Sequence, residues 1–323
     1  MITRRAVVSA LAASGLAGAL GRAAAQSYPD KPIKLVVPYP PGGPIDTTAR
    51  VVAQQITTRL GQVIIENRPG GGATLGSKSV ATAEPDGYTL LFGSSGSLCV
   101  APALYSNADY DPIKSFAPVA SVALLPHVFV VAPSVPATKL QEFVAYAKAN
   151  PGKLNYGSAI GTPPHLLSTL FRAKAGIDIV YVPYKGSAQS VTDLLGGQTQ
   201  MTIDGLTGLY PLIQDQKVRA LAMASATRWP ALPDVPTMIE SGYSDFNLDA
   251  WTGVVAPAGT PREIVARLNA AINEGLQSPE AKQSLVKISA VAKTGTPEAF
   301  GTFLAAELPK WTAIVKISGA KVE

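Results

Sequence analysis

The chain has 323 residues, of which 47% are hydrophobic and 15% charged. That length suggests two domains of roughly 150 residues each, with enough apolar side chains for real cores. The single cysteine excludes an internal disulfide, and two histidines without a CxxC or HxxxH spacing argue against a structural metal site. The formal net charge of +5 falls to about +2 without the three arginines of residues 1–25, which leaves no electrostatic case for nucleic-acid binding.

Residues 1–25 have the pattern of a secretory signal peptide. Arg4 and Arg5 form a basic start, residues 6–20 form an apolar run, and three consecutive alanines end at Ala25. The apolar run is short for a membrane span, so we predict cleavage near Ala25 rather than a retained anchor. Whether export uses the general or the twin-arginine route stays open.

Residues 33–60 predict a strand, a glycine turn and a helix. Residues 33–37 form an apolar, β-branched run that suits a buried strand, and the prolines and glycines of residues 38–44 cannot continue it. Asp46 is placed as the N-cap of a helix whose apolar face begins at Ile45. Free N–H groups at such a helix start favour a small anion, although an ordinary βα turn without a ligand uses the same residue types.

This pattern recurs in the following segment. Strands are predicted at 63–65 and 88–92, a helix at 73–83, and turns rich in glycine or serine at 67–72 and 93–97. Strand, turn and helix in alternation predict a parallel sheet covered on both faces. Ligands of such sheets bind beyond the carboxyl ends of the strands, which is where these turns and the first turn should lie.

A second unit of the same kind begins near His127. Thr138 and Gln141 resemble a capping box before a helix that ends at Asn150. The predicted strands and the turns that follow them place glycine, serine and Asp204 at strand ends. The predicted strands cover residues 128–131, 154–156, 179–182, 201–203 and 218–223, and the turns cover 157–162, 183–187 and 204–205.

The chain then returns through residues 246–256, which contain Trp251. Thr260 and the proline after it predict a helix start. The last helix carries an apolar face from Phe300 onward, and Pro309 predicts a kink or break in it. Because no strand is predicted after these helices, we expect the final helical pair to cover the first domain.

Several ordered motifs resemble the Bug family, the periplasmic solute receptors of tripartite tricarboxylate transporters. The resemblance runs from Tyr28 to the C-terminus. It rests on VPYPPGGPIDTTAR, ENRPGGG, EPDGYTLL, NPGKLNYGS, VPYKG, LPDVPT and a W-x-G at 251–253 followed by APAGTP. It implies a type II periplasmic binding protein fold, with two doubly wound α/β domains and a ligand cleft between them. Domain 1 would comprise residues 26–124 and 250–323, and domain 2 residues 125–249.

The resemblance also implies ligand-binding positions in two opposing loops. Family ligands are mostly small carboxylates, including di- and tricarboxylates, acidic amino acids and aromatic acids, and they are held by backbone amides, hydroxyls and ordered waters. The second loop is one residue shorter than the usual pattern, which puts its amide positions in question. The matching residues are Pro41, Gly42, Gly43, Ile45 and Asp46 in the first loop, and Gly157, Ser158, Gly161, Thr162 and His165 in and after the second.

Other candidate ligand contacts each have a structural alternative. Ser94 and Ser95 could offer hydroxyls or simply form a turn, and His165 could instead be a packed core histidine. Lys185 could pair with a second carboxylate or be solvated, and Asp204 could face the cleft or cap a turn. Tyr39, Tyr184 and Trp251 could wall the ligand or serve only in packing.

The functional prediction is a periplasmic receptor that captures a small carboxylate by domain closure and presents it to a membrane transporter. We expect a monomer without cofactor, metal, catalysis or nucleic acid. The alternative is a secreted α/β serine hydrolase acting on small esters. Residues 93–97 nearly match G-x-S-x-G but end in Ser97, and Ala159 occupies the nucleophile position of residues 157–161. A pure interaction protein is the third possibility.

Overall fold

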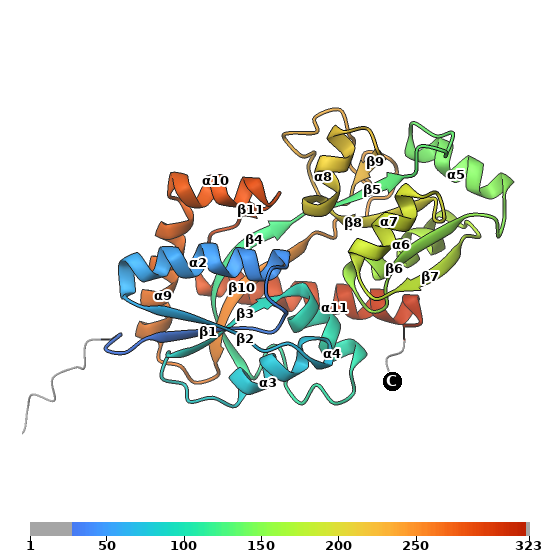
Figure 1. The fold of residues 1–323 in the computed structure, drawn as a ribbon. Helices are drawn as coiled ribbons and strands as arrows, with labels where there is room; N and C mark the ends of the chain where they lie inside the picture. The colour runs from blue at the N-terminus through green and yellow to red at the C-terminus, as the bar shows by residue number, and fades with distance from the viewer. Residues whose placement is uncertain (1–27, 321–323) are drawn as a thin grey trace, which may run out of the picture.

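The computed structural model describes residues 28–320, so the predicted signal peptide lies outside the described residues. Two α/β lobes lie side by side, each built around its own sheet (Figure 1). This is the predicted two-domain α/β architecture. Among the described residues, no helix is both long and apolar enough to cross a membrane.

The first lobe contains a six-stranded sheet in the order β11-β4-β10-β3-β1-β2. Strands β1, β2 and β3 are parallel, as the sequence predicted, but β10 is antiparallel to both β3 and β4. The returning strand is therefore inserted in the middle of the sheet. The strands are β1 (Ile33–Val37), β2 (Val63–Asn67), β3 (Thr89–Ser94), β4 (Phe116–Leu125), β10 (Ala250–Pro257) and β11 (Val291–Ala292).

The second lobe repeats this arrangement with five strands in the order β7-β6-β8-β5-β9. Here the entering strand β5 is antiparallel to its neighbours β8 and β9, while β6 is parallel to β7 and β8. Both sheets thus combine parallel strands with one antiparallel crossover strand. The strands are β5 (His127–Val131), β6 (Asn155–Ala159), β7 (Val180–Tyr184), β8 (Met201–Gly205) and β9 (Arg219–Met223).

Helices connect and cover the strands of both sheets (Figure 1). In the first lobe they are α2 (Pro44–Leu60), α3 (Thr74–Ala81), α4 (Ala101–Leu104), α9 (Arg262–Leu276), α10 (Pro279–Lys287) and α11 (Pro297–Ser318), with short helical turns η1 (Gly71–Ala73) and η2 (Gly96–Val100). In the second lobe they are α5 (Leu140–Ala149), α6 (Pro163–Ala175), α7 (Ser187–Leu195) and α8 (Leu206–Gln214).

The apolar periodicity of the first strand–turn–helix unit accounts for its packing. Strand β1 is almost wholly buried, and α2 buries Ala49, Val52 and Ile56 against the sheet. These positions are spaced by three and four residues, which puts them on one helix face. The predicted C-cap, Gly61, ends the helix with its N–H bonded to the Thr57 carbonyl.

Two local predictions were wrong, and a third was wrong in part. Helix α2 begins at Pro44 with Gly43 as its N-cap, so Asp46 lies inside the first turn. The capping box of α5 is formed by Glu142, which accepts from the backbone of Thr138 and Lys139, and not by Gln141. At Pro309 a break is absent, because helix α11 continues through this proline, which removes only one donor; a kink there stays a prediction.

Helix α11 also reaches further than predicted, and a short strand, β11, precedes it. Helix α11 packs against β4 and η2 of the first lobe and against α6 of the second (Figure 1). Trp251, at the start of β10, is buried against Phe300 and Phe303 of this helix, with ring centroids 5.9 and 5.5 Å apart. The C-terminal helix therefore links the apolar cores of both lobes.

Candidate functional site

A cavity of about 290 Å³ lies where loops of both lobes meet at the carboxyl ends of their strands. The turns after β1, β2 and β3 all contribute. The alternation of strands and glycine turns predicted that they share this edge, but only some of them were expected to face one cleft. The second lobe contributes the loop between β6 and α6. The lining residues are Pro38, Tyr39, Pro40, Pro69, Gly70, Gly72, Ala73, Gly96, Val100, Ala101, Tyr105 and, from the second lobe, Ile160, Gly161, Thr162 and Pro163.

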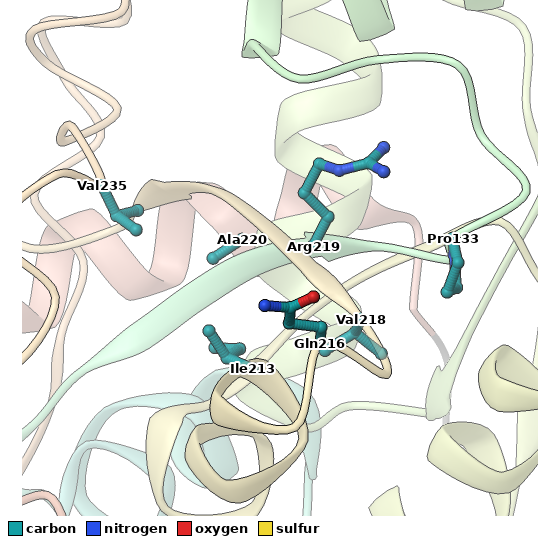
Figure 2. A pocket seen from close by; sticks show the side chains of 7 residues that line it. All are labelled: Pro133, Ile213, Gln216, Val218, Arg219, Ala220 and Val235. Carbon is teal, nitrogen blue, oxygen red and sulfur yellow. The ribbon is translucent and has the colours of Figure 1, made fainter.

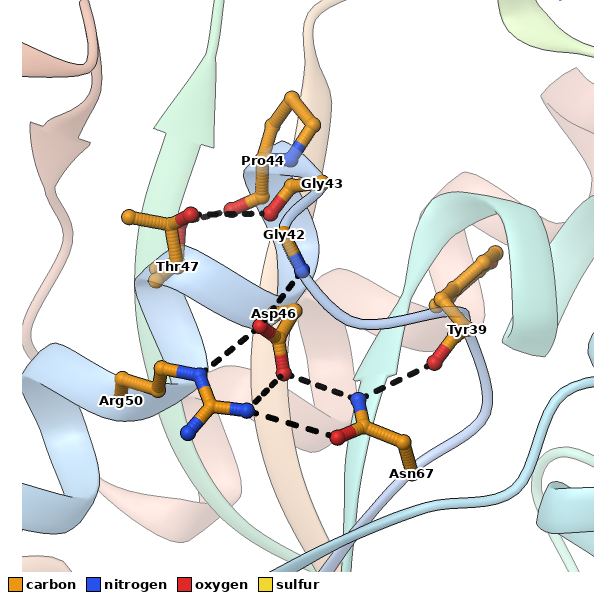
Figure 3. A network of polar contacts seen from close by, with 9 residues as sticks. Tyr39, Gly42, Gly43, Pro44, Asp46, Thr47, Arg50 and Asn67 are labelled. Carbon is orange, nitrogen blue, oxygen red and sulfur yellow. Dashed lines mark hydrogen bonds and ion pairs between the residues drawn. The ribbon is translucent and has the colours of Figure 1, made fainter.

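The loop after β1 is held from inside by Asp46 (Figure 3). The Asp46 carboxylate accepts from the Gly42 N–H (2.9 Å), from Arg50 Nε (2.8 Å) and from Asn67 Nδ2 (2.8 Å). Asn67, at the end of β2, also donates to the Tyr39 carbonyl at 3.1 Å. Burial alone would raise the pKa of Asp46, but the hydrogen bonds from Arg50, Gly42 and Asn67 outweigh it and lower that pKa. Asp46 therefore stays ionised and fixes the loop.

This network changes which amides can meet a ligand. The Gly42 N–H is already taken by Asp46. Within the described chain, the N–H groups of Gly43, Ile45 and Asp46 have no hydrogen-bond partner, as expected at a helix start. Gly42 has φ +87°, a backbone angle that favours glycine. A Cβ added at Gly43 would meet no atom within 4 Å, so the space in front of this residue is free. The free amides thus lie along the backbone from Gly43 to Asp46, beside the exposed Pro41.

The serines after β3 divide into two kinds. The Ser94 hydroxyl is 2.8 Å from the Tyr39 hydroxyl and accepts from the Ser97 N–H at 3.3 Å, so it braces the first loop. The Ser95 hydroxyl is buried and has no hydrogen-bond partner among the described residues. Of the two predicted hydroxyls, only that of Ser95 is uncommitted.

The opposing loop is organised around His165. The Gly161 N–H donates to His165 Nδ1 at 3.3 Å, and the Thr162 hydroxyl donates to the Ala159 carbonyl at 2.6 Å. The His165 ring lies 4.5 Å from that of Tyr181, and burial followed by the charge of Arg172 lowers the pKa of His165. His165 is therefore a neutral, packed histidine that shapes the loop.

This loop also touches the first lobe. Gly161 has φ +73°, and a Cβ at this position would lie 2.5 Å from Cδ2 of Leu104 in α4. The backbone angle favours glycine here, and a Cβ would in addition force the Leu104 side chain of the other lobe to shift.

Three predicted ligand residues are committed elsewhere or exposed. The Tyr184 hydroxyl donates to Asp193 at 2.6 Å, and its ring covers Gly157. The Lys185 side chain is exposed. Trp251 packs against α11, as described above, and its indole N–H has no partner among the described residues.

Ser158 and Asp204 are buried at the ends of β6 and β8. Neither the Ser158 hydroxyl nor Oδ2 of Asp204 has a hydrogen-bond partner in the described part of the chain, whereas Oδ1 of Asp204 accepts from the Gly205 N–H at 2.7 Å. Buried polar atoms without partners are rare in folded proteins, so these atoms mark a place where polar groups of a ligand or water are needed.

Two supporting residues escaped the sequence analysis. Asn67 was placed in a glycine turn, and only the pairing of Val37 with Asn67 across the parallel strands reveals that it reaches Asp46. His127 was taken only as the start of a strand. It is buried, its Nδ1 has no partner among the described residues, and burial lowers its pKa to about 4.

A second cavity, of about 320 Å³, lies on the second lobe beside strand β9 (Figure 2). Its one charged lining residue, Arg219, is occupied by the carbonyls of Val135 (3.1 Å) and Ala137 (2.9 Å). No loop of the first lobe lines it, so domain closure would not enclose a ligand there.

The described residues do not contain the hydrogen-bonded pair of serine and histidine that the serine hydrolase alternative requires. Within residues 28–320, neither Ser95 nor Ser158 makes a hydrogen bond to a histidine, and His165 Nδ1 is taken by the Gly161 amide. Nor does this part of the chain contain a cluster of three or more histidine, cysteine or acidic side chains that could hold a metal.

Two α/β lobes with paired crossover strands and a cavity at their facing strand ends define a periplasmic binding protein. The family model of the tripartite tricarboxylate transporter family receptor matches residues 48–320. The chain belongs to this family, whose members are solute-binding proteins and not enzymes.

Solved structures show the same fold. The periplasmic binding protein BugD is 35% identical, with a TM-score of 0.77 over 92% of this chain and 100% of its own. The R. palustris protein Rpa4515, solved with adipate, is 36% identical, with a TM-score of 0.80 over 91% of this chain and 100% of its own. MatC from Rhodopseudomonas palustris, solved with bound malate, is 33% identical, with a TM-score of 0.76 over 89% of this chain and 100% of its own.

Proposed function

We propose that this protein is a periplasmic receptor that binds a small organic carboxylate in the cleft between its lobes. Two observations support the proposal: the free amides at the start of α2 in the first lobe, and the buried polar atoms without partners at the strand ends of the second lobe. Oriented N–H groups at a helix start attract an anion, and the helix dipole adds to this. Family membership, together with relatives solved with adipate and malate, supports a carboxylate as that anion.

The mechanism we propose is closure of the two lobes on the ligand. The lobes would comprise residues 26–124 with 250–323, and residues 125–249, and would hinge at the two crossovers. A carboxylate would meet Gly43, Ile45 and Asp46 N–H on the first lobe. The loop at Gly161 and Thr162 would then cover it from the second.

We further propose that the loaded receptor presents its ligand to membrane subunits of a tripartite tricarboxylate transporter. The family description supports this role. Such a receptor would be exported, lose its signal peptide near Ala25, and act as a monomer in the periplasm.

The test is a thermal unfolding screen of ligand-stripped protein against mono-, di- and tricarboxylates. A ligand at about 100 times its Kd stabilises a folded protein by roughly 2.7 kcal/mol, which is easily seen as a shift in Tm. We expect at least one small acid to raise the Tm, and Gly43→Val to abolish that shift while leaving the unliganded Tm unchanged. No shift with any acid would contradict the proposed function.

A further inference from the structure

Asp204 is a buried carboxylate with half of its hydrogen-bonding capacity unused. It is 7% exposed, and Oδ1 accepts from the Gly205 N–H at 2.7 Å. Oδ2 has no partner among the described residues, and no ion pair to Asp204 is formed in that part of the chain. A buried carboxylate oxygen without a hydrogen-bond donor lowers the stability of the folded state. Stability therefore does not explain why an aspartate stands at position 204.

The sheet register places Asp204 at the cleft edge of the second lobe. Strand β6 pairs with β8 at Tyr156 and Met201, so continuing this parallel register sets Ala159 beside Asp204. Residues 160–163, which follow directly, line the interlobe cavity. On the other side, the Leu206 N–H bonds to the Pro126 carbonyl of the crossover at 2.9 Å. Asp204 therefore lies between the cleft loop and the hinge.

The surroundings supply hydroxyls and amides but no cation. None of the described residues that line the interlobe cavity is charged, and Lys185, the one cation among the predicted ligand residues, is exposed. Burial raises the pKa of Asp204, and this rise is only partly opposed by the Ser187 hydroxyl and the Gly205 amide. A second carboxylate of a diacid would find no positive charge here and would face Asp204.

We propose that the bound acid carries a hydrogen-bond donor, a hydroxyl or an ammonium, which it gives to Oδ2 of Asp204. This inference rests on the proposed carboxylate-binding function and narrows it to hydroxy or amino acids over their unsubstituted parents. The amides of α2 would take the carboxylate common to all these acids. Asp204 would then discriminate by the substituent, because leaving its oxygen unpaired penalises a ligand without a donor.

The experiment is calorimetric titration of wild-type protein with three matched series. These are propionate, lactate and alanine; succinate, malate and aspartate; and glutarate, 2-hydroxyglutarate and glutamate. In whichever series binds, we expect the hydroxy or amino acid to bind at least about tenfold more tightly than its parent. The hydroxyl and ammonium members of each series separate the two kinds of donor.

The variant Asp204→Asn tests the residue itself. It keeps an acceptor for the Gly205 amide but replaces the free oxygen by a donor, so we expect the preference over the parent acid to fall below about threefold. The control is Asp215→Asn, an exposed residue of the same lobe paired with Lys217, which should leave the preference unchanged. Unfolding of ligand-free Asp204→Asn should occur at or above the wild-type Tm.

The outcomes separate the two proposals. If no acid binds, the carboxylate function fails, and this inference fails with it. If acids bind but the unsubstituted parent binds as tightly as its substituted forms, only the inference is overturned. An unchanged preference in a folded Asp204→Asn variant overturns it as well.

Discussion

The two sides of the cleft differ in how many of their buried polar side chains have hydrogen-bond partners. On the first lobe, the loop after β1 is closed by the Asp46 network, which ties Gly42, Arg50 and Asn67 together. On the second lobe, Ser158, Asp204 and His127 are buried, and each has an atom without a hydrogen-bond partner in the described chain. The first side thus has a loop fixed by internal hydrogen bonds, with only main-chain amides and the Ser95 hydroxyl left free, whereas the second side leaves atoms of buried titratable side chains unpaired.

We infer from this difference that the two sides of the cleft recognise different parts of the ligand. A loop already held by internal hydrogen bonds loses little entropy when it binds, so it suits the part of the ligand that never varies. Unpaired groups penalise the wrong ligand, so they suit the part that must be recognised. The predictions below test whether the two sides differ in this way.

The largest effect is expected from Asp46→Ala. This variant removes a buried acceptor and leaves the Gly42 N–H and the Asn67 amide without their partner, so we expect a loss of about 2–4 kcal/mol in unfolding free energy. Urea unfolding measures it. Arg50→Ala is the matched control, because its side chain is 54% exposed and should cost under about 1 kcal/mol. Equal losses in the two variants would show that the loop is not held by Asp46.

The second prediction concerns pH. Burial lowers the pKa of His127 to about 4 from an ordinary 6.5, so the unfolded chain binds more protons between these values and stability falls as pH drops from about 6.5 to 4. The loss is about 3 kcal/mol at most. His127→Gln should flatten this part of the profile of unfolding free energy against pH.

Asp249, on the return crossover, should act in the opposite sense. Burial raises its pKa to about 6, so the folded state binds more protons and stability falls as pH rises from about 4 to 6. Asp249→Asn should remove that fall. A wild-type profile that neither variant alters would contradict the view that this side carries uncompensated groups.

The third prediction tests contact between the lobes. Gly161→Ala adds a Cβ at a positive φ and within 2.5 Å of Leu104, so we expect about tenfold weaker ligand binding as closure is impeded. Leu104→Ala in the same background should recover part of the affinity by removing the steric component. Titration of the best acid from the screen measures both. Undiminished affinity in Gly161→Ala would mean that this loop does not close against α4.

The smallest effect is expected from Thr207→Val. The Thr207 hydroxyl donates to the Ile288 carbonyl of the first lobe at 2.5 Å, on the side of α10. Losing this bond between lobes should cost about 0.5–1.5 kcal/mol of closed-state stability, seen as a modest rise in Kd. Thr192→Val, within α7, removes a bond internal to one helix and should leave the Kd unchanged.

Much of the fold could be predicted because periodicity and glycine turns are local signals. The order of strands, turns and helices followed from apolar runs such as residues 33–37, and the common sheet edge of three turns followed from parallel pairing, although only some of them were expected to face one cleft. The antiparallel placement of β5 and β10, and the reach of α11 across both lobes, could not be predicted, since they depend on tertiary packing.

The candidate site was harder to predict, because the sequence shows which polar residues follow strands but not which of them already have partners. Ser94 and Ser95 are adjacent, yet only the hydroxyl of Ser94 is engaged by Tyr39. Likewise, the Gly42 N–H donates to Asp46 and is not free for a ligand. The predicted role of Asp46 as the N-cap was wrong because the helix already begins at Pro44.

The most direct measurement is a crystal structure of the protein with the acid that binds most tightly in the thermal screen. The account predicts the carboxylate at the N–H groups of Gly43, Ile45 and Asp46, and a hydroxyl or ammonium of the ligand within hydrogen-bond distance of Asp204 Oδ2. An acid bound away from this cleft, or one whose carboxylate contacts the second lobe alone, would contradict it.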